Sequence, residues 1–283
     1  MFFLNLEFIK KCVEIQQNSF EIIKNYDAFI VDVWGVIHSS GVLYKNTENA
    51  MKQMMEFGRV ILLSNAPRRA TKVQNFLSGI GIKQGVHYHD ILTSGEAFLH
   101  HAKQSGHKTV FYLGPEKDLD VLDGERIEIT HNIDDAFDDA IVTGLTDVED
   151  LKKDIPILEK LLQKSIVLSC INPDIVVKVG NGHQLCAGAL AKEYEKMGGS
   201  VKYFGKPHGE VYAMVFEMLN RVKKDKILAI GDGMETDILG ANNAGIDSLL
   251  CVGGIHDREI HWKGVDEFLC EFKQRPTFVA ESI

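Results

Sequence analysis

Short, wholly apolar segments rich in β-branched or aromatic residues alternate along this chain with segments of helical spacing, and no other feature constrains the fold as strongly. The apolar segments cover residues 28–31, 60–63, 110–113, 141–143, 166–168, 227–230 and 248–252. The helical segments cover residues 46–58, 67–79, 95–105, 148–163, 185–197, 209–223 and 236–244. Apolar runs of this length predict strands buried on both faces, as in a parallel sheet. The sequence therefore predicts an α/β fold with a doubly wound parallel sheet and right-handed crossovers.

Charge and hydropathy exclude two classes of partner. The 283 residues carry a net charge of −9 and contain no basic run, whereas nucleic-acid binding needs clustered Lys and Arg to displace phosphate counterions. No apolar run reaches the ~18 residues of a membrane-spanning helix. We therefore expect neither a nucleic-acid nor a membrane partner.

The N-terminus and the cysteines indicate a reducing compartment. Glu7 interrupts the apolar start of the chain and lysines follow it, which is the reverse of the order in a signal peptide. The five cysteines are scattered and form no CxxC pair, as expected of buried single thiols. We therefore expect a soluble, cytoplasmic protein, and we expect the first 24 residues to form an amphipathic helix.

Polar residues stand where several predicted strands end or helices begin. They are Asp32, Ser64, Lys206, Asp232 and Asp237. Ligands of open α/β sheets bind beyond the carboxyl ends of the strands, so we expect these side chains in one crevice. Carboxylate oxygens hold Mg²⁺, a lysine and helix N-terminal amides neutralise phosphoryl oxygens, and a carboxylate can attack phosphorus. The set predicts a phosphate site with its own magnesium ion.

The motifs that carry these residues resemble those of the haloacid dehalogenase superfamily, in the same order. The first reads DVWGV from Asp32, the second contains Ser64 in LSNAP, the third is Lys206 in GKP, and the fourth, GDGMETD, begins at Gly231. The long insertion between Ser64 and Lys206 resembles the class IIA (NagD-type) cap. The segments TSGEA at 93–97, NPD at 172–174 and CAGAL at 186–190 agree with that subclass.

The resemblance implies a Mg²⁺ site and a nucleophile. Asp32 resembles the nucleophile, which is also a metal ligand. Asp232 resembles the second carboxylate ligand, and Asp237 resembles one that acts directly or through water. The backbone carbonyl of Trp34 occupies the position of a further ligand. In this reading an aspartyl-phosphate forms on Asp32.

The resemblance also implies the phosphate contacts. Ser64 and Lys206 resemble the groups that bind the phosphoryl oxygens, with Lys206 also counted as catalytic. Backbone amides near Gly35 and Asn65 are expected to assist in binding the substrate.

Trp34 departs from the family pattern, because the side chain at this position is usually an Asp that acts as general acid and then general base. Indole has one weak N–H donor and no basic site near neutral pH. Loss of such a group typically costs about 10²–10⁴-fold in rate, least for leaving groups that need little protonation. His38 is a candidate replacement, since imidazole titrates near pH 7, although a structural role is the simpler reading.

The resemblance divides the chain into a core of residues 1–105 and 201–283 and a cap of residues 106–200. Within the cap, Asn172, Asp174 and His183 are candidates for substrate contact, but an NPD segment is also a plain turn sequence. Caps of this class can carry dimer interfaces, so a homodimer is an open expectation.

Two functions from different classes remain at this point. The first is a Mg²⁺-dependent phosphatase-like hydrolase of a small phosphorylated metabolite, with a cap that excludes water and selects the substrate. The second is a phosphometabolite-binding protein that lost turnover with its acid–base residue, which Trp34 favours. Phosphoryl transfer to an acceptor other than water is a third reading.

Overall fold

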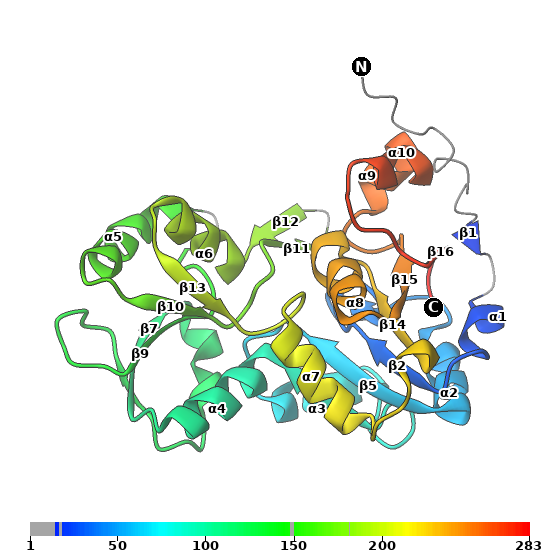
Figure 1. Ribbon diagram of the computed structural model, residues 1–283, viewed down its shortest axis with the longest axis horizontal. Helices are drawn as coiled ribbons and strands as arrows, with labels where there is room; N and C mark the ends of the chain where they lie inside the picture. The colour runs from blue at the N-terminus through cyan, green and yellow to red at the C-terminus, as the bar shows by residue number, and fades with distance from the viewer. Residues whose placement is uncertain (1–14, 17–18, 148–149, 181) are drawn as a thin grey trace.

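The computed structural model describes residues 15–16, 19–147, 150–180 and 182–283. Two parallel sheets form two lobes, each with helices packed against its sheet (Figure 1). The predicted α/β class with a doubly wound parallel sheet is confirmed. Among the described residues, no helix is long and apolar enough to cross a membrane.

The larger sheet has seven strands in the order β1-β16-β15-β14-β2-β5-β6. Their bounds, in that order, are Ile15–Gln16, Phe278–Ala280, Asp247–Cys251, Ile227–Gly231, Ala28–Val31, Arg59–Ser64 and Asp90–Thr93. From β2 the chain adds β5 and β6 on one side, and it later adds β14, β15 and β16 on the other. The order therefore reverses between β2 and β14, and ligands of doubly wound folds bind at such a point.

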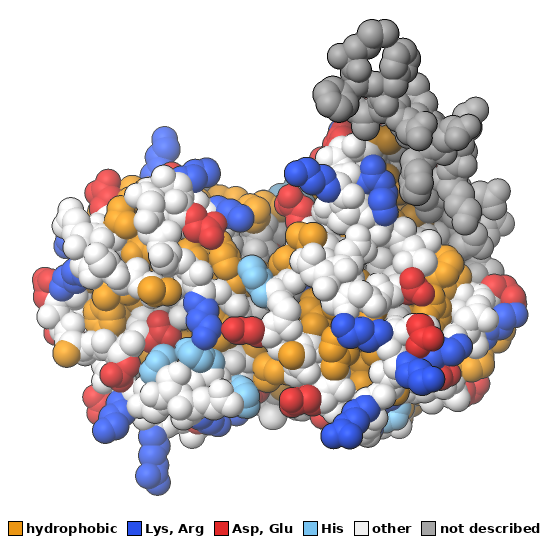
Figure 2. Space-filling model, viewed as in Figure 1, with side chains coloured by type: hydrophobic (Ala, Val, Ile, Leu, Met, Phe, Trp, Pro, Cys, Tyr) orange, Lys and Arg blue, Asp and Glu red, His pale blue; other side chains and the backbone are white. Residues whose placement is uncertain are grey.

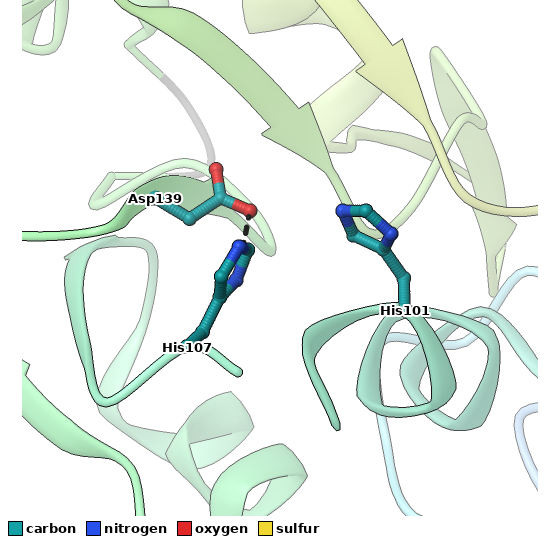
Figure 3. Close-up of side chains that lie close together, drawn as sticks. All are labelled: His101, His107 and Asp139. Atoms are coloured by element: carbon teal, nitrogen blue, oxygen red, sulfur yellow. Dashed lines mark ion pairs between the residues drawn. The ribbon is translucent and has the colours of Figure 1, made fainter. Parts of the chain in front are cut away.

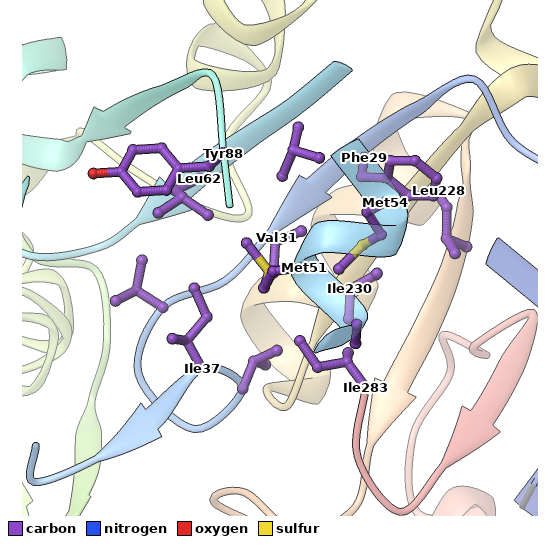
Figure 4. Close-up of a cluster of buried hydrophobic side chains, with 14 of the residues drawn as sticks. Phe29, Val31, Ile37, Met51, Met54, Leu62, Tyr88, Leu228, Ile230 and Ile283 are labelled. Atoms are coloured by element: carbon purple, nitrogen blue, oxygen red, sulfur yellow. The ribbon is translucent and has the colours of Figure 1, made fainter. Parts of the chain in front are cut away.

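Alternate residues of the central strands face opposite layers of helices, which is why these strands are apolar throughout. Phe29 and Val31 of β2 pack with α2 (Thr47–Phe57) and α3 (Ala70–Gly79), in the cluster drawn in Figure 4. Ala28 and Ile30 face the other layer. That layer contains α4 (Ser94–Ser105), α7 (Gly209–Met218) and α8 (Leu239–Ala244).

The smaller sheet has five parallel strands in the order β13-β10-β9-β7-β8. Their bounds are Ser200–Tyr203, Val167–Cys170, Asp139–Val142, Thr109–Leu113 and Glu128–Thr130. One face packs on α5 (Ile155–Gln163) and α6 (Ala187–Lys196). The other face presents Val110, Tyr112 and Ile141 to the α4 layer of the larger lobe. One apolar cluster therefore spans both lobes.

Two hairpins and several short helices complete the chain. The hairpins are β3–β4 (His38–Ser39 and Val42–Leu43) and β11–β12 (Val176–Val179 and Gly182–Leu185). The remaining α-helices are α1 (Phe20–Ile23), α9 (Asp257–Lys263) and α10 (Val265–Cys270). 3₁₀-helices cover Glu116–Leu122, Leu151–Lys153 and Lys224–Lys226, and a π-helix covers Met234–Ile238. In Figure 1 the β11–β12 hairpin projects from the smaller lobe toward the larger one.

Several sequence expectations are wrong in detail. The helix expected over 148–163 begins only at Ile155, where Pro156 occupies its first turn and presets the backbone. The helix expected over 209–223 ends at Met218, because Asn220 and Arg221 adopt positive φ. Cys270 is exposed and not a buried thiol.

Two expectations stand apart from these. Of the expected N-terminal helix, residues 1–14 and 17–18 lie outside the described part, while β1 and the one-turn α1 occupy the rest. The division into a core and a cap at 105/106 and 200/201 stays a prediction. The strand β13 spans Ser200–Tyr203 and pairs within the smaller sheet, so this sheet continues past the predicted boundary at 200/201.

Candidate active site

Three buried carboxylates meet where the strand order reverses. Asp32 directly follows β2 and Asp232 directly follows β14, and these strands are paired with Val31 beside Ile230. Asp237 lies in the π-helix that follows. Asp32, Asp232 and Asp237 each offer a carboxylate oxygen, and these oxygens lie within 4.8 Å of one another. The adjacency predicted from the strand ends is therefore present in the structure.

Lys206 lies against two of the three carboxylates. Its Nζ donates to Asp32 Oδ1 at 2.5 Å and to Asp237 Oδ1 at 2.6 Å, and the side chain is 4% exposed. Its own backbone N–H donates to the side-chain oxygen of Asn65 at 2.7 Å. Asn65 thus holds the lysine loop against the end of β5 and fixes where the ammonium lies.

The charges at this point do not balance, since three carboxylates face one ammonium. Burial raises the pKa of Asp32 to about 7 against the lowering effect of Lys206, and Asp237 adds to the rise. Burial, followed by the charges of Asp32 and Asp237, raises the pKa of Asp232 well above its ordinary value. Burial opposes the charge of Lys206, but Asp237 and Asp32 outweigh it and raise its pKa. A further positive charge would relieve this repulsion.

The donor set at this point fits a hard dication. All three side chains offer carboxylate oxygens, which Mg²⁺ prefers over nitrogen or sulfur ligands. Asp232 is oriented by the backbone N–H of Ile255, which donates to its Oδ2 at 2.7 Å. Asp237 accepts from the backbone N–H of Gly233 at 3.1 Å. The carbonyl ligand predicted at Trp34 stays a prediction.

Gly35 has a different role from the one expected. Its N–H donates to the carbonyl of His38 at 2.9 Å, so the amide expected to contact phosphate is already bonded within the loop. Its φ is +94°, and a Cβ at this position would lie 1.9 Å from Asp232 Oδ2. Only glycine therefore allows the loop after β2 to pass this close to the second carboxylate.

Ser64 and Asn65 end β5 at the same edge of the sheet. The Ser64 hydroxyl accepts from the backbone N–H of Ala66 at 3.2 Å and lines the cavity described below. The Asn65 side chain donates to Asp174 Oδ1 at 2.8 Å and to the carbonyl of Lys206 at 3.1 Å. The side chain of Asn65 is therefore a structural link, and a phosphate contact at Asn65 would fall to its backbone.

Trp34 connects the active-site loop to the smaller lobe. Its indole Nε1 donates to the backbone carbonyl of Lys178 in β11 at 2.9 Å. The Lys178 ammonium in turn lies 3.3 Å from the carbonyl of Gly254 and 3.2 Å from Asp257 Oδ2 in the larger lobe. These bonds hold the β11–β12 hairpin over the crevice. Neither the hairpin nor its link to Trp34 was expected from the sequence.

His38 is buried next to Trp34. Its ring lies 5.2 Å from the Trp34 ring and 5.0 Å from the Phe76 ring, measured between centroids. Burial lowers its pKa to about 4, so it is neutral near pH 7. A general acid must carry its proton at working pH. This lowered pKa weighs against the proposed stand-in role of His38.

A cavity of about 410 Å³ lies over the carboxylates. The five polar residues predicted from the motifs line it. Its lining also contains apolar side chains, among them Trp34, Phe76, Leu145, Val176 and Leu185, and the basic side chains of Arg68, Lys72, Lys117 and Lys178. Volumes of this size suit small metabolites.

The three cap residues considered for substrate contact differ in position. Asn172 and Asp174 line the cavity. Asn172 Oδ1 also accepts a hydrogen bond from the Asp174 N–H at 3.2 Å, as expected if the NPD segment is a turn. His183 is exposed on β12 and does not line the cavity. Lys178 and Ile255 line it without having been expected, because nothing in their local sequence marks them.

Comparison with solved structures places the fold among known hydrolases. A haloacid dehalogenase-like family hydrolase from Brucella suis 1330 is 29% identical, with a TM-score of 0.83, over 95% of this chain and all (100%) of the other. The p-nitrophenyl phosphatase from Archaeoglobus fulgidus is 21% identical, with a TM-score of 0.74, over 91% and 97% of the two chains. NagD from E. coli K-12 is 20% identical, with a TM-score of 0.66, over 91% and 97%. At these lower identities the likeness concerns the fold, and it agrees with the predicted NagD-type arrangement.

Two segments of the chain match protein families. Comparison with curated proteins finds no match. Residues 29–128, with Asp32 and Ser64, match the haloacid dehalogenase-like hydrolase family. Residues 203–283, with Lys206, Asp232 and Asp237, match the HAD-hydrolase-like family. The matched segments contain the side chains that converge at the carboxylate cluster, and the chain belongs to the haloacid dehalogenase superfamily.

Proposed function

We propose that this protein is a Mg²⁺-dependent phosphoric monoester hydrolase that acts on a small phosphorylated metabolite through an aspartyl-phosphate on Asp32. The observation that carries the proposal is the buried cluster of Asp32, Asp232 and Asp237 with Lys206 between two of its members. Several proteins of the same fold are described as phosphatases, among them the p-nitrophenyl phosphatase from Archaeoglobus fulgidus and a possible sugar phosphatase from Cytophaga hutchinsonii.

The residues present can carry out the bond changes in two steps. An Asp32 oxygen attacks phosphorus, the bond to the leaving oxygen breaks, and the phosphoryl group is held on the carboxylate. Water then attacks phosphorus, the bond to Asp32 breaks and inorganic phosphate leaves. Lys206 and Ser64 stabilise the phosphoryl oxygens in both steps. A Mg²⁺ ion bound by Asp32, Asp232 and Asp237 would orient the phosphate and offset its charge.

The absence of a carboxylate at position 34 bears on which class of substrate we expect. With indole at this position and His38 neutral near pH 7, neither side chain beside the nucleophile can protonate a leaving alkoxide. Esters of acidic alcohols, such as aryl phosphates, need no such proton. Apolar side chains in the cavity lining, such as Trp34 and Phe76, suit contact with an aromatic or aliphatic leaving group. We therefore expect aryl phosphates to be turned over faster than alkyl phosphates.

The hairpin over the crevice supports a small substrate. Because β11 is bonded to Trp34 and to the Gly254 loop, the cavity is roofed by the smaller lobe. A roofed site excludes bulk water and admits small molecules more readily than folded phosphoproteins.

A binding protein without turnover is the second candidate, and the Trp34 substitution favours it. Such a protein would bind the phosphorylated metabolite between Lys206, Ser64 and the metal and would release it unchanged. The buried Asp32 and the cluster it forms with Asp232 and Asp237 favour the enzyme, since binding alone does not need a carboxylate nucleophile.

Purified protein should be assayed with Mg²⁺ against small phosphate esters that include aryl and alkyl members. Asp32→Asn is the matched variant, because an amide has nearly the shape of the carboxylate but cannot attack phosphorus. We expect measurable hydrolysis of aryl phosphates by the wild type and none by the folded variant. Equal release of phosphate by the two proteins would show that Asp32 is not the nucleophile. Tight binding of phosphate esters without any hydrolysis would favour the binding protein.

A further inference from the structure

A second group of potential metal ligands lies away from the active site, where the two lobes meet. His101 is in α4 of the larger lobe, His107 is in the turn between α4 and β7, and Asp139 begins β9 of the smaller lobe. Each offers one ligand atom, and these atoms lie within 4.8 Å of one another. Figure 3 shows the His107 ring directed at the Asp139 carboxylate and the His101 ring facing both across a gap.

One nitrogen atom of this group, in His107, has no hydrogen-bond partner among the described residues. His107 Nδ1 is buried and has no hydrogen-bond partner within the described part of the chain. It lies 3.6 Å from Asp139 Oδ2, which is longer than a hydrogen bond. Buried polar atoms in folded proteins are nearly always paired with protein, water or an ion. This nitrogen therefore requires a partner, and a metal ion between the three side chains would provide one.

The surroundings orient two of the side chains. The Ser169 hydroxyl in β10 lies 2.9 Å from each oxygen of Asp139, and it fixes the plane of the carboxylate. The His101 ring packs on Phe204 at 5.3 Å and edge-on to His107 at 5.5 Å, between centroids. Residues that orient ligands in this way are a regular part of metal sites.

One cation competes for this position. Lys202 in β13 places its Nζ 3.2 Å from His101 Nδ1 and 3.4 Å from Nε2. The same Nζ lies over the Phe204 ring, 5.4 Å from the ring centroid. An incoming metal ion would have to displace this ammonium, so removal of the lysine charge should favour metal binding.

We propose that His101, His107 and Asp139 form a site for a transition-metal dication of the zinc class. Two imidazoles and one carboxylate suit Zn²⁺ and similar borderline ions, whereas the all-carboxylate cluster of the active site suits Mg²⁺. The two sites thus differ in the metal they select. A metal bound here joins α4 of the larger lobe to β9 of the smaller lobe, and it stabilises the folded protein because the unfolded chain lacks the site.

Equilibrium dialysis of the full chain against Zn²⁺, in excess Mg²⁺ and with a reductant, tests the proposal. We expect the wild type to retain one equivalent of Zn²⁺ more than His107→Ala and His101→Ala. The matched control is His261→Ala, an exposed histidine on α9, which should retain as much as the wild type. Comparison of variants cancels any Zn²⁺ held by cysteines or by the active site. Equal retention by the wild type and both folded alanine variants would overturn the proposal.

Two further variants test the geometry without removing a ligand. Ser169→Ala should weaken Zn²⁺ binding by roughly 10–100-fold, as loss of an orienting partner usually does. Lys202→Met keeps the length of the stem and should bind Zn²⁺ more tightly than the wild type. An unchanged affinity in Ser169→Ala together with weaker binding by Lys202→Met would contradict a metal between these three side chains. Figure 2 shows histidine side chains at the surface near the boundary of the two lobes. All three proposed ligands are partly exposed, so added Zn²⁺ can reach them.

Discussion

Replacing Trp34 by Asp tests whether the missing carboxylate limits catalysis. A general acid–base contributes about 10²–10⁴-fold to such reactions. An Asp at this position would restore a group that protonates the leaving oxygen and then activates water. The gain should therefore appear with alkyl phosphates and be much smaller with aryl phosphates, which leave without a proton.

The structure also gives the cost of the change. Trp34→Asp removes the hydrogen bond from Nε1 to the Lys178 carbonyl, at 2.9 Å. A hydrogen bond of this kind contributes a net ~0.5–1.5 kcal/mol. If all of it held the hairpin closed, its loss would lower the closed population by about tenfold at most, since ~1.4 kcal/mol corresponds to a factor of ten. The catalytic gain exceeds this cost, so the net effect on alkyl phosphates should be positive.

Trp34→Asn is the matched control, because it removes the same ring and the same hydrogen bond but supplies no ionisable group. The assay is kcat/KM for glycerol phosphate and for p-nitrophenyl phosphate with saturating Mg²⁺, for both variants. We expect Trp34→Asp to exceed Trp34→Asn strongly on the first substrate and weakly on the second. Equal values of kcat/KM on glycerol phosphate, with both variants folded and metal-bound, would refute the inference that the missing acid–base group at position 34 limits catalysis.

Three further results are expected. The pKa of Asp32 is raised from 3.8 to about 7, so the folded state binds a proton more tightly than the unfolded state and the metal-free protein should lose stability from about pH 4 to 7. Thermal unfolding should consequently show a larger rise in Tm on addition of Mg²⁺ at pH 8 than at pH 5, and equal rises would contradict it. Gly35→Ala should abolish Mg²⁺ binding because its Cβ meets Asp232, whereas Gly41→Ala, with φ +86° and only an ordinary contact of 3.8 Å to Phe76, should keep it in a calorimetric titration. Trp34→Phe keeps a ring but removes the N–H that donates to the Lys178 carbonyl, so hydrogen exchange of the β11 amides should become faster. Unchanged exchange would show that this hydrogen bond does not hold the hairpin.

The polar ends of the strands could be predicted because the signal is local. Asp32, Ser64 and Asp232 each stand at the end of an apolar run whose length and β-branched content predict a buried strand, and parallel strands end at one edge of the sheet. The sheet order around β2 and β14 then brings the carboxylates together. Local sequence was therefore enough for the centre of the site.

The contacts that enclose the site could not be predicted in the same way. Trp34 and Lys178 are 144 residues apart, and Asn65 and Asp174 are 109 apart. Their pairing depends on how the smaller lobe packs on the larger one. The β11–β12 hairpin itself is short and only partly buried, so it lacks the continuous apolar pattern that marks a strand.

His38 shows a third limit. Its type and its nearness to Asp32 in sequence made it a candidate acid–base group. The structure buries it between Trp34 and Phe76, and this burial lowers its pKa to about 4. Burial by distant residues decides the proton affinity of a histidine, and the sequence alone does not contain it.

Trapping the phosphorylated enzyme tests the central claim most directly. Without a base at position 34, hydrolysis of the aspartyl-phosphate should be slower than its formation from an aryl phosphate. Rapid mixing with p-nitrophenyl phosphate and Mg²⁺ should release close to one equivalent of nitrophenolate per site in a burst. Acid quench and peptide mass spectrometry should then find a phosphoryl group on Asp32, and none in Asp32→Asn. Two results would contradict a nucleophilic Asp32, each seen as steady hydrolysis without a burst. One is a phosphoryl group found on another residue, and the other is an equal rate of hydrolysis in Asp32→Asn.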